Sequence, residues 1–277
     1  MIVKGKLPFP ISDSLIGFDA EWTKNYKIKN GNVPFCFSIV AVKRKSITME
    51  HLVNGNIQFE YMQFYCENKE ETVDLIKNAN IYAGYICDSL DTCILCGHQV
   101  SSDYSVLVNM GIARDICDLD NLNKLQEIWH KRKSETKIRM VDTRYDINRG
   151  FMGKSRRLVD MCNDFFMDVR QPELNNTSMT KLQNQFYDRG DFVFYERIAV
   201  MNLRHSLSAV LLYWMNDQIK DKSQLTSVNI NRIVLAIWKK ILNGYIRIYL
   251  VNYYKDIKGR RNKSVQFVRR LFYILET

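Results

Sequence analysis

Hydrophobic and polar positions follow two spacings along the chain, one typical of strands and one typical of helices. The runs at 15–22 and 35–43 are rich in β-forming residues, and the turn-like Asn30-Gly31-Asn32 lies between them. Such a pattern predicts two neighbouring strands. Prolines at positions 8 and 10 predict that residues 1–14 form an irregular lead-in. Further strands are expected at 46–52, 59–66, 92–96 and 138–142.

Apolar residues at intervals of three and four predict helices between and after these strands. Val73, Ile76 and Ala79 follow two glutamates and predict an amphipathic helix over residues 70–80. Residues 81–86 fit either an extension of this helix or a short strand. Other helices are expected at 101–110, 121–130, 158–166, 180–186, 192–219, 229–254 and 264–275. This order, with three strands in an antiparallel meander and later strands alternating with helices, predicts an α/β fold with helices packed on a sheet.

The positive charge of the chain is concentrated at its C-terminal end. The net charge is +10, and residues 218–277 hold 13 Lys and Arg against 3 Asp and Glu, so that the first 217 residues are neutral. We therefore expect a main domain over 1–217 and a basic helical extension over 218–277. A basic region on a neutral domain favours a polyanionic partner, nucleic acid before membrane. A solvated basic helix face is the alternative.

Cysteine usage predicts a reducing, cytoplasmic compartment. Seven cysteines, an odd number, occur without a signal-peptide pattern, which argues against a disulfide framework. Cys93 and Cys96 have the spacing of a zinc site, with Cys87 and His98 nearby. Because they fall in a predicted strand and no second such pair exists, buried free thiols are the favoured interpretation. The most apolar stretch, 233–254, contains Lys and Arg, so no transmembrane segment is expected.

The most informative stretch is Leu-Ile-Gly-Phe-Asp-Ala-Glu-Trp at 15–22. An apolar strand here contains Asp19 and Glu21, two positions apart. Side chains at i and i+2 of a strand lie on the same face, so the two carboxylates would be adjacent. Adjacent carboxylates repel each other, and a divalent cation is the plainest reason for keeping them together.

A third acidic candidate follows a later predicted strand. In Gly97-His98-Gln99-Val100-Ser101-Ser102-Asp103, Asp103 lies in the first turn of a predicted helix. From there it can reach the carboxyl ends of the strands, where open α/β sheets place their sites. An acid in a first helical turn is also common as a partner of the helix dipole, so Asp103 gains weight only in combination with Asp19 and Glu21.

Taken together, these motifs resemble those of the DEDD 3′–5′ exonuclease superfamily, whose fold is ribonuclease-H-like and whose nearest members are RNase D and Werner-type exonucleases. Residues 17–22 are similar to the first motif of the family, residues 97–103 to the second, and Val141-Asp142-Thr143 to the strand and Asp-Thr pair that usually follow. The resemblance covers roughly residues 12–217.

The resemblance implies hydrolysis of phosphodiester bonds with two Mg²⁺ or Mn²⁺ ions, which hard carboxylate oxygens suit. It also implies that Asp19, Glu21 and Asp103 hold the metals; His205 is a further candidate catalytic residue. Candidate contacts to RNA or DNA are His98, Arg204, Lys258, Arg260 and Arg261.

The third motif departs from the family pattern. The family has a Tyr or His base and then an Asp four or five residues later, whereas here His205 stands in the place of that Asp. His205 could be a nitrogen ligand or position a water in a working site. Alternatively, Asp142 or Asp146 supplies the fourth carboxylate, or the site is degenerate.

Three functional hypotheses follow. The first is a metal-dependent 3′–5′ exonuclease that acts on single-stranded ends of RNA or DNA. The second is a nucleic-acid-binding or scaffold protein on an exonuclease-like fold with little or no hydrolysis. The third and weakest is a protein that docks on membranes through its basic helices.

Overall fold

The computed structural model describes residues 1–24, 31–134, 137, 139–147, 153–170 and 177–238. Contacts within the chain divide it into two units, Met1–Ala236 and Ile237–Thr277. The first unit therefore extends beyond residue 217, where the charge distribution places the start of the extension. The second unit falls almost entirely outside the described residues, as do the helix predicted at 264–275 and most of the one at 229–254.

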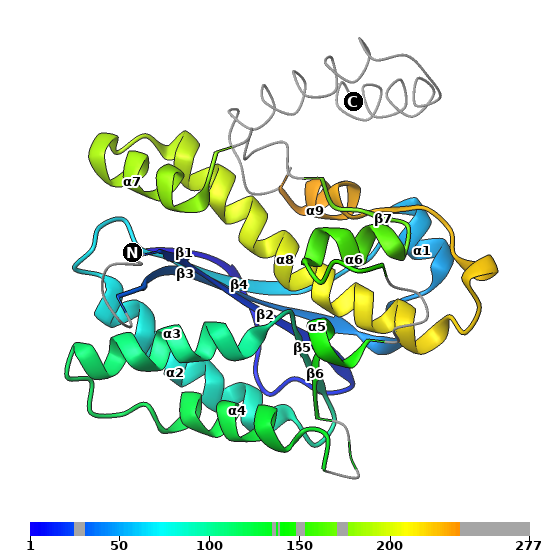
Figure 1. Ribbon diagram of the computed structural model, residues 1–277, viewed down its shortest axis with the longest axis horizontal. Helices are drawn as coiled ribbons and strands as arrows, with labels where there is room; N and C mark the ends of the chain where they lie inside the picture. The colour runs from blue at the N-terminus through cyan, green and yellow to red at the C-terminus, as the bar shows by residue number, and fades with distance from the viewer. Residues whose placement is uncertain (25–30, 135–136, 138, 148–152, 171–176, 239–277) are drawn as a thin grey trace. The chain divides into compact units, whose positions relative to one another are not determined.

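A mixed sheet lies at the centre of the first unit, and six strands form it among the described residues (Figure 1). Their spatial order is β1-β4-β3-β2-β5-β6. The pairs β1–β4, β3–β4 and β2–β3 are antiparallel, whereas β2–β5 and β5–β6 are parallel. The strands are β1 (Ile2–Lys6), β2 (Ser14–Thr23), β3 (Val33–Lys43), β4 (Glu60–Tyr65), β5 (Ile94–Gly97) and β6 (Met140–Asp142). The expected α/β class is confirmed.

Two sequence-based expectations about the sheet are wrong. Residues 1–14, predicted to be irregular, contain edge strand β1. Both prolines follow this strand and leave its hydrogen bonds to β4 intact. Residues 46–52 do not form a strand but lie in a 3₁₀ turn (Arg44–Ser46) and helix α1 (Met49–Asn54). The hydroxyl of Thr48 caps α1, and Gly55 ends it with a φ of 70°. The third strand of the meander is therefore β4.

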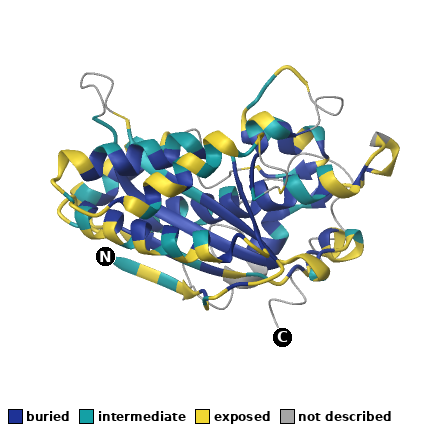
Figure 2. Ribbon diagram, turned by 90° about the horizontal axis from the view of Figure 1, so that it is seen from below, coloured by how far each residue is buried: buried dark blue, intermediate teal, exposed yellow. Residues whose placement is uncertain are grey.

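Helices cover both faces of this sheet (Figure 1), and the strands between them are mostly buried (Figure 2). One layer contains α2, α3 and α4, and the long helix α8 crosses the opposite face. Residues 81–86 extend α2. The helices are α2 (Thr72–Ser89), α3 (Val100–Ala113), α4 (Asp120–Lys131), α5 (Thr143–Asp146), α6 (Leu158–Asp164), α7 (Met179–Arg189), α8 (Phe192–Gln218) and α9 (Ile230–Trp238). A two-stranded parallel sheet, β7 (Met167–Asp168) with β8 (Val228–Asn229), and a 3₁₀ turn (Lys222–Gln224) complete these elements. No helix among the described residues is long and apolar enough to span a membrane.

Alternation along the strands separates an aromatic face of the sheet from a polar one. Phe18 of β2 packs against Tyr104 of α3, with ring centroids 5.3 Å apart, and Phe64 of β4 packs against Tyr82 of α2 at 5.2 Å. The residues next to these phenylalanines point to the other face. The α2–α3 side is therefore an apolar core, and the polar side chains of the central strands turn toward α8.

A row of polar residues crosses the sheet beneath α8. Asp19 pairs in register with Ser38 of β3, and Ser38 pairs with Gln63 of β4. We call Asp19, Ser38 and Gln63 the polar row. Ser38 and Gln63 are at most 1% exposed. Buried polar groups of this kind need hydrogen-bond partners, and α8 lies where it can supply them.

Gly17 allows α8 to pack directly against β2. A Cβ atom at this position would lie 2.3 Å from the backbone oxygen of Ser206. Any side chain would therefore push the helix away from the strand. This close approach brings the residues of α8 around position 205 within reach of Asp19, which is two residues beyond Gly17 on the same face.

Candidate functional site

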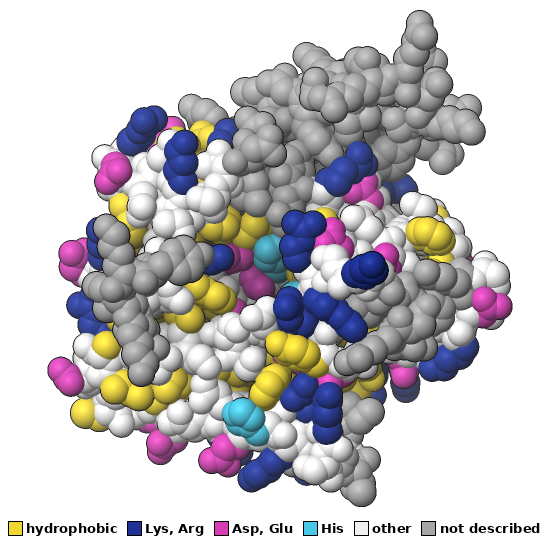
Figure 3. Space-filling model, viewed as in Figure 1, with side chains coloured by type: hydrophobic (Ala, Val, Ile, Leu, Met, Phe, Trp, Pro, Cys, Tyr) yellow, Lys and Arg dark blue, Asp and Glu magenta, His cyan; other side chains and the backbone are white. Residues whose placement is uncertain are grey.

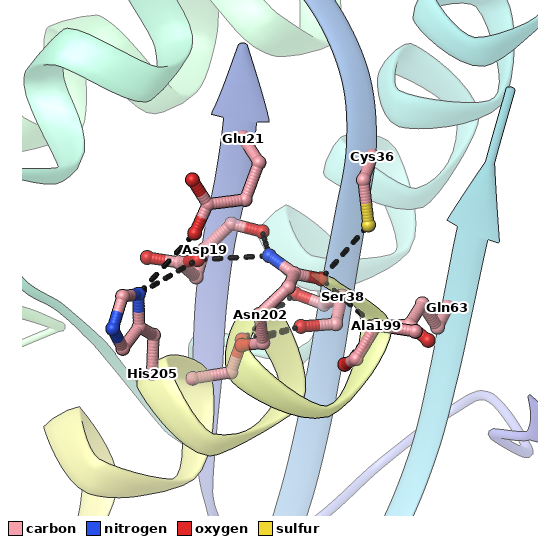
Figure 4. Close-up of polar contacts among 9 residues, drawn as sticks. Asp19, Glu21, Cys36, Ser38, Gln63, Ala199, Asn202 and His205 are labelled. Carbon is pink, nitrogen blue, oxygen red and sulfur yellow. Dashed lines mark hydrogen bonds and ion pairs between the residues drawn. The ribbon is translucent and has the colours of Figure 1, made fainter. Parts of the chain in front are cut away.

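Asp19, Glu21 and His205 come together where β2 meets α8 (Figure 4). The Nδ1 atom of His205 lies 3.3 Å from Oε1 of Glu21 and 3.6 Å from Oδ2 of Asp19. One potential ligand atom from each residue lies within 4.8 Å of the other two. The side chains are 14–21% exposed, so solvent reaches the cluster. Among the residues that the structure describes, this is the one group of three or more His, Cys, Asp or Glu side chains that could hold a metal ion.

The residues of the cluster shift one another's pKa values. Burial and the negative charge of Asp19 raise the pKa of Glu21 to about 7, although His205 partly offsets them. Burial disfavours the charged form of His205, but the charges and hydrogen bonds of Asp19 and Glu21 outweigh it and raise its pKa to about 10. The imidazolium form of His205 therefore supplies positive charge to the two carboxylates when no other cation is present.

Asp103 lies beside this cluster but is not part of it. Its side chain begins in the first turn of α3 and is 4% exposed. Burial and the negative charges of Asp19, Glu21 and Asp142 raise its pKa well above the usual range, against a hydrogen bond from the backbone of Ala20. The structure thus brings the three predicted carboxylates into one electrostatic environment, with Asp103 deeper than the other two.

His98 lies next to the same centre. Its Nδ1 atom is 3.0 Å from the hydroxyl oxygen of Thr143. The Thr143 hydroxyl donates its proton to the backbone oxygen of Gly97 at 3.0 Å. Burial lowers the pKa of His98 to about 4, and the positive charges of His205 and Arg144 act in the same direction. His98 is therefore neutral at neutral pH, and its orientation is fixed by the Thr143 contact.

Of the other predicted substrate contacts, only Arg204 is among the described residues. Arg204 is 2% exposed, because neighbouring residues of a helix point about 100° apart and His205 takes the outward direction. Lys258, Arg260 and Arg261 fall outside the described residues.

The two alternative fourth carboxylates have structural partners. Asp142 accepts hydrogen bonds from the backbone of Gln99 at 2.9 Å and of Arg144 at 3.1 Å, and from the indole of Trp129 at 2.9 Å. Asp146 accepts from Arg132 at 2.7 Å and from the backbone of Asp142 at 2.9 Å. Asp142 is the last residue of β6, close enough to Asp103 for its charge to raise the pKa of that carboxyl, and Asp146 is the last residue of α5.

The cysteines do not form a metal site in the structure. All seven are free, and both Cys93 and Cys96 are buried, which agrees with the favoured interpretation. Burial raises the pKa of Cys96, and no group of cysteines meets the geometry for an ion among the described residues.

Asn202 is a site residue that sequence reasoning missed. Its Nδ2 atom donates to Oδ2 of Asp19 at 2.8 Å and to the backbone oxygen of Asp19 at 3.0 Å. Asparagine within a helix carries no pattern that indicates such a partner, since Asp19 lies 183 positions away. The one available signal was its place one turn before His205.

Acidic and histidine side chains lie together at the centre of one face of the molecule, with Lys and Arg side chains beside them (Figure 3). A negative centre next to positive side chains can hold a cation and an anionic group side by side.

Comparisons of the chain with models of protein families, with curated proteins and with solved structures found no match.

Proposed function

We propose that this chain is a divalent-metal-dependent 3′–5′ exonuclease that hydrolyses phosphodiester bonds at single-stranded ends of RNA or DNA. The observation that carries the proposal is the meeting of Asp19, Glu21 and His205 within 4.8 Å, with Asp103 buried beside them. The assignment of the sheet to the ribonuclease-H-like fold is part of this proposal. It is supported by the antiparallel meander β2–β3–β4, followed by the parallel strands β5 and β6.

The donor set fits a divalent ion. Carboxylate oxygens suit Mg²⁺ and Mn²⁺, and a cation bound here would counteract the burial and the charge of Asp19 that raise the pKa of Glu21. Asp19, Glu21 and His205 would hold one ion, and Asp103 together with Asp19 would hold a second. Because imidazole nitrogen is a softer ligand than oxygen, we expect His205 to favour Mn²⁺ over Mg²⁺.

A bound metal pair would lower the pKa of a water molecule and stabilise the leaving 3′ oxygen. The residues of the chain would orient the substrate around that centre. Neutral His98, held by Thr143, lies where a sugar hydroxyl of the substrate can hydrogen-bond to it. Arg144 lies close enough to lower the pKa of His98 and can contact a phosphate.

Digestion of end-labelled RNA and DNA single strands in Mg²⁺ or Mn²⁺ tests this function. Wild type should release mononucleotides from the 3′ end, and Asp19→Ala should lose more than about 100-fold of the rate, because metal ligands act as a unit. Asp91→Ala is the matched control, since Asp91 is 83% exposed and its ion pair is with Lys137. Equal rates in wild type and Asp19→Ala would refute the proposal.

A second candidate is a nucleic-acid-binding or scaffold protein without hydrolysis. The contacts of His205 with both carboxylates favour it, because an imidazolium supplies the positive charge that a metal would otherwise bring. This candidate predicts salt-sensitive binding of nucleic acid that survives Asp19→Ala, with no product in any metal.

A further inference from the structure

A buried hydrogen-bond network connects the polar row of the sheet to α8 (Figure 4). The amide oxygen of Asn202 accepts from Nε2 of Gln63 at 3.0 Å and from the thiol of Cys36 at 3.2 Å. Its amide nitrogen donates to Asp19. Asn202, Cys36 and Gln63 are at most 1% exposed. The two contacts of the amide oxygen are thus made inside the protein, and the two of the amide nitrogen reach the partly exposed Asp19.

These contacts fix the orientation of the Asn202 amide. Nε2 of Gln63 also donates to the backbone oxygen of Ala199 at 2.9 Å, and a backbone oxygen can only accept. The Gln63 amide group must therefore direct its nitrogen toward α8 and Asn202. Oδ1 of Asn202 must then face Gln63, which leaves Nδ2 facing Asp19. A flipped Asn202 would place its donor against the donor of Gln63 and its oxygen against a carboxylate.

From this chain of contacts we infer that Asn202 is a positioning residue for the metal centre and that Gln63 acts through it. The Nδ2 atom binds both the side chain and the backbone of Asp19, so it fixes the rotation of that carboxylate. Oδ2 of Asp19 is the atom that it holds, and the same oxygen lies 3.6 Å from Nδ1 of His205 in the cluster. Partners that orient a ligand in this way commonly set the affinity for the metal. The inference rests on the proposed function, because it concerns the same site.

Ser206 offers a matched control within the same interface. Its hydroxyl lies 2.6 Å from the hydroxyl of Ser38 and 3.3 Å from the backbone oxygen of Asn202, and it has no contact with Asp19. Ser206 is fully buried, as Asn202 is. Removing either side chain weakens the packing of α8 on the sheet, but removing Asn202 alone releases the Asp19 carboxylate.

Calorimetric titration with Mn²⁺ tests the inference on wild type, Asn202→Leu and Ser206→Ala. Asn202→Leu should weaken Mn²⁺ binding by about 10- to 100-fold, the usual effect of losing a residue that orients a ligand, whereas Ser206→Ala should stay within about twofold. Thermal unfolding of the metal-free variants separates this effect from lost stability. Wild-type affinity in Asn202→Leu, or an equal loss in Ser206→Ala, would overturn the inference.

A second measurement does not depend on metal or on the folding of the Asn202 variant. In metal-free protein labelled with ¹⁵N, the Nδ2 protons of Asn202 should shift in Asp19→Ala and stay unchanged in Glu21→Ala. Both variants lose a carboxylate of the cluster, but of these two carboxylates it is Asp19 that accepts a hydrogen bond from Nδ2 of Asn202. Unchanged Nδ2 signals in Asp19→Ala would refute the positioning contact. Should wild type bind no Mn²⁺, the proposed function fails and this spectrum alone decides the role of Asn202.

Discussion

Replacing Gly17 by alanine should separate α8 from β2. The added Cβ atom would lie 2.3 Å from the backbone oxygen of Ser206 and 2.7 Å from Cγ2 of Val40, whereas ordinary contact begins at 3.4 Å. Val40 can move its side chain, but the backbone of α8 cannot yield by changing a rotamer. The helix must therefore shift by about 1 Å, the kind of adjustment that overpacked sites require.

The expected effect combines lost stability with lost metal binding. Overpacking of this kind costs about 1–3 kcal/mol in the free energy of unfolding. A shift of the helix away from the strand would also lengthen the bond between Nδ2 of Asn202 and Oδ2 of Asp19, which is 2.8 Å. At about 3.8 Å that contact is no longer a hydrogen bond. We therefore expect Mn²⁺ affinity to fall together with stability.

Urea unfolding and Mn²⁺ titration of Gly17→Ala check this prediction. Gly153→Ala is the control, because its Cβ atom would lie 3.5 Å from the nearest atom, an oxygen of Asp164. That control should stay within about 0.5 kcal/mol of wild type, as exposed substitutions usually do. A Gly17→Ala protein as stable as Gly153→Ala, with unchanged Mn²⁺ affinity, would show that α8 does not pack on β2 as described.

Three further predictions concern charge. The pKa of His205 is raised from 6.5 to about 10, so its contribution to metal-free stability is complete below pH 6.5 and is lost as the pH rises through about 10. The difference in melting temperature between wild type and His205→Asn should therefore shrink between pH 6.5 and about pH 10. A difference that stays constant over this range would contradict the prediction. Asp142→Asn should lower the free energy of unfolding in urea by about 1–3 kcal/mol, because an amide donor then faces the Trp129 indole. It should leave Mn²⁺ affinity intact, and a tenfold loss of affinity would make Asp142 a ligand. Arg132→Met should cost about 2 kcal/mol by removing the 2.7 Å ion pair with Asp146, whereas Lys131→Met, at a residue 64% exposed, should have little effect in the same assay.

Local sequence pattern was sufficient for the elements that carry the cluster, but not for every element of the sheet. The spacing of Asp19 and Glu21 on an apolar strand predicted their common face, and the apolar content of 192–219 predicted the helix that carries His205. The prediction of a strand at 46–52 is wrong because the cap that Thr48 provides for helix α1 outweighs the alternation of apolar residues. Both Thr48 and Gly55 were available as signals for a helix.

Contacts between distant parts of the chain were beyond sequence reasoning. The resemblance to the exonuclease motifs singles out His205, but its distances to Asp19 and Glu21 follow from how α8 crosses the sheet. Asn202 gave no signal, since its role depends on side chains from β2, β3 and β4. The structural roles of Asp142 and Asp146 likewise depend on Trp129 and Arg132, whose arrangement no local pattern specifies.

The pairing of β2 with α8 has a consequence for protein synthesis. Asp19 is made early, whereas Asn202, which bonds to it, follows 183 residues later. Chains are synthesised from the N-terminus, so a nascent chain exposes Asp19 and Glu21 long before His205 exists. The cluster therefore cannot assemble until nearly all of the first unit has left the ribosome. A fragment that ends before α8 would carry the two carboxylates but none of the contacts that hold them in place.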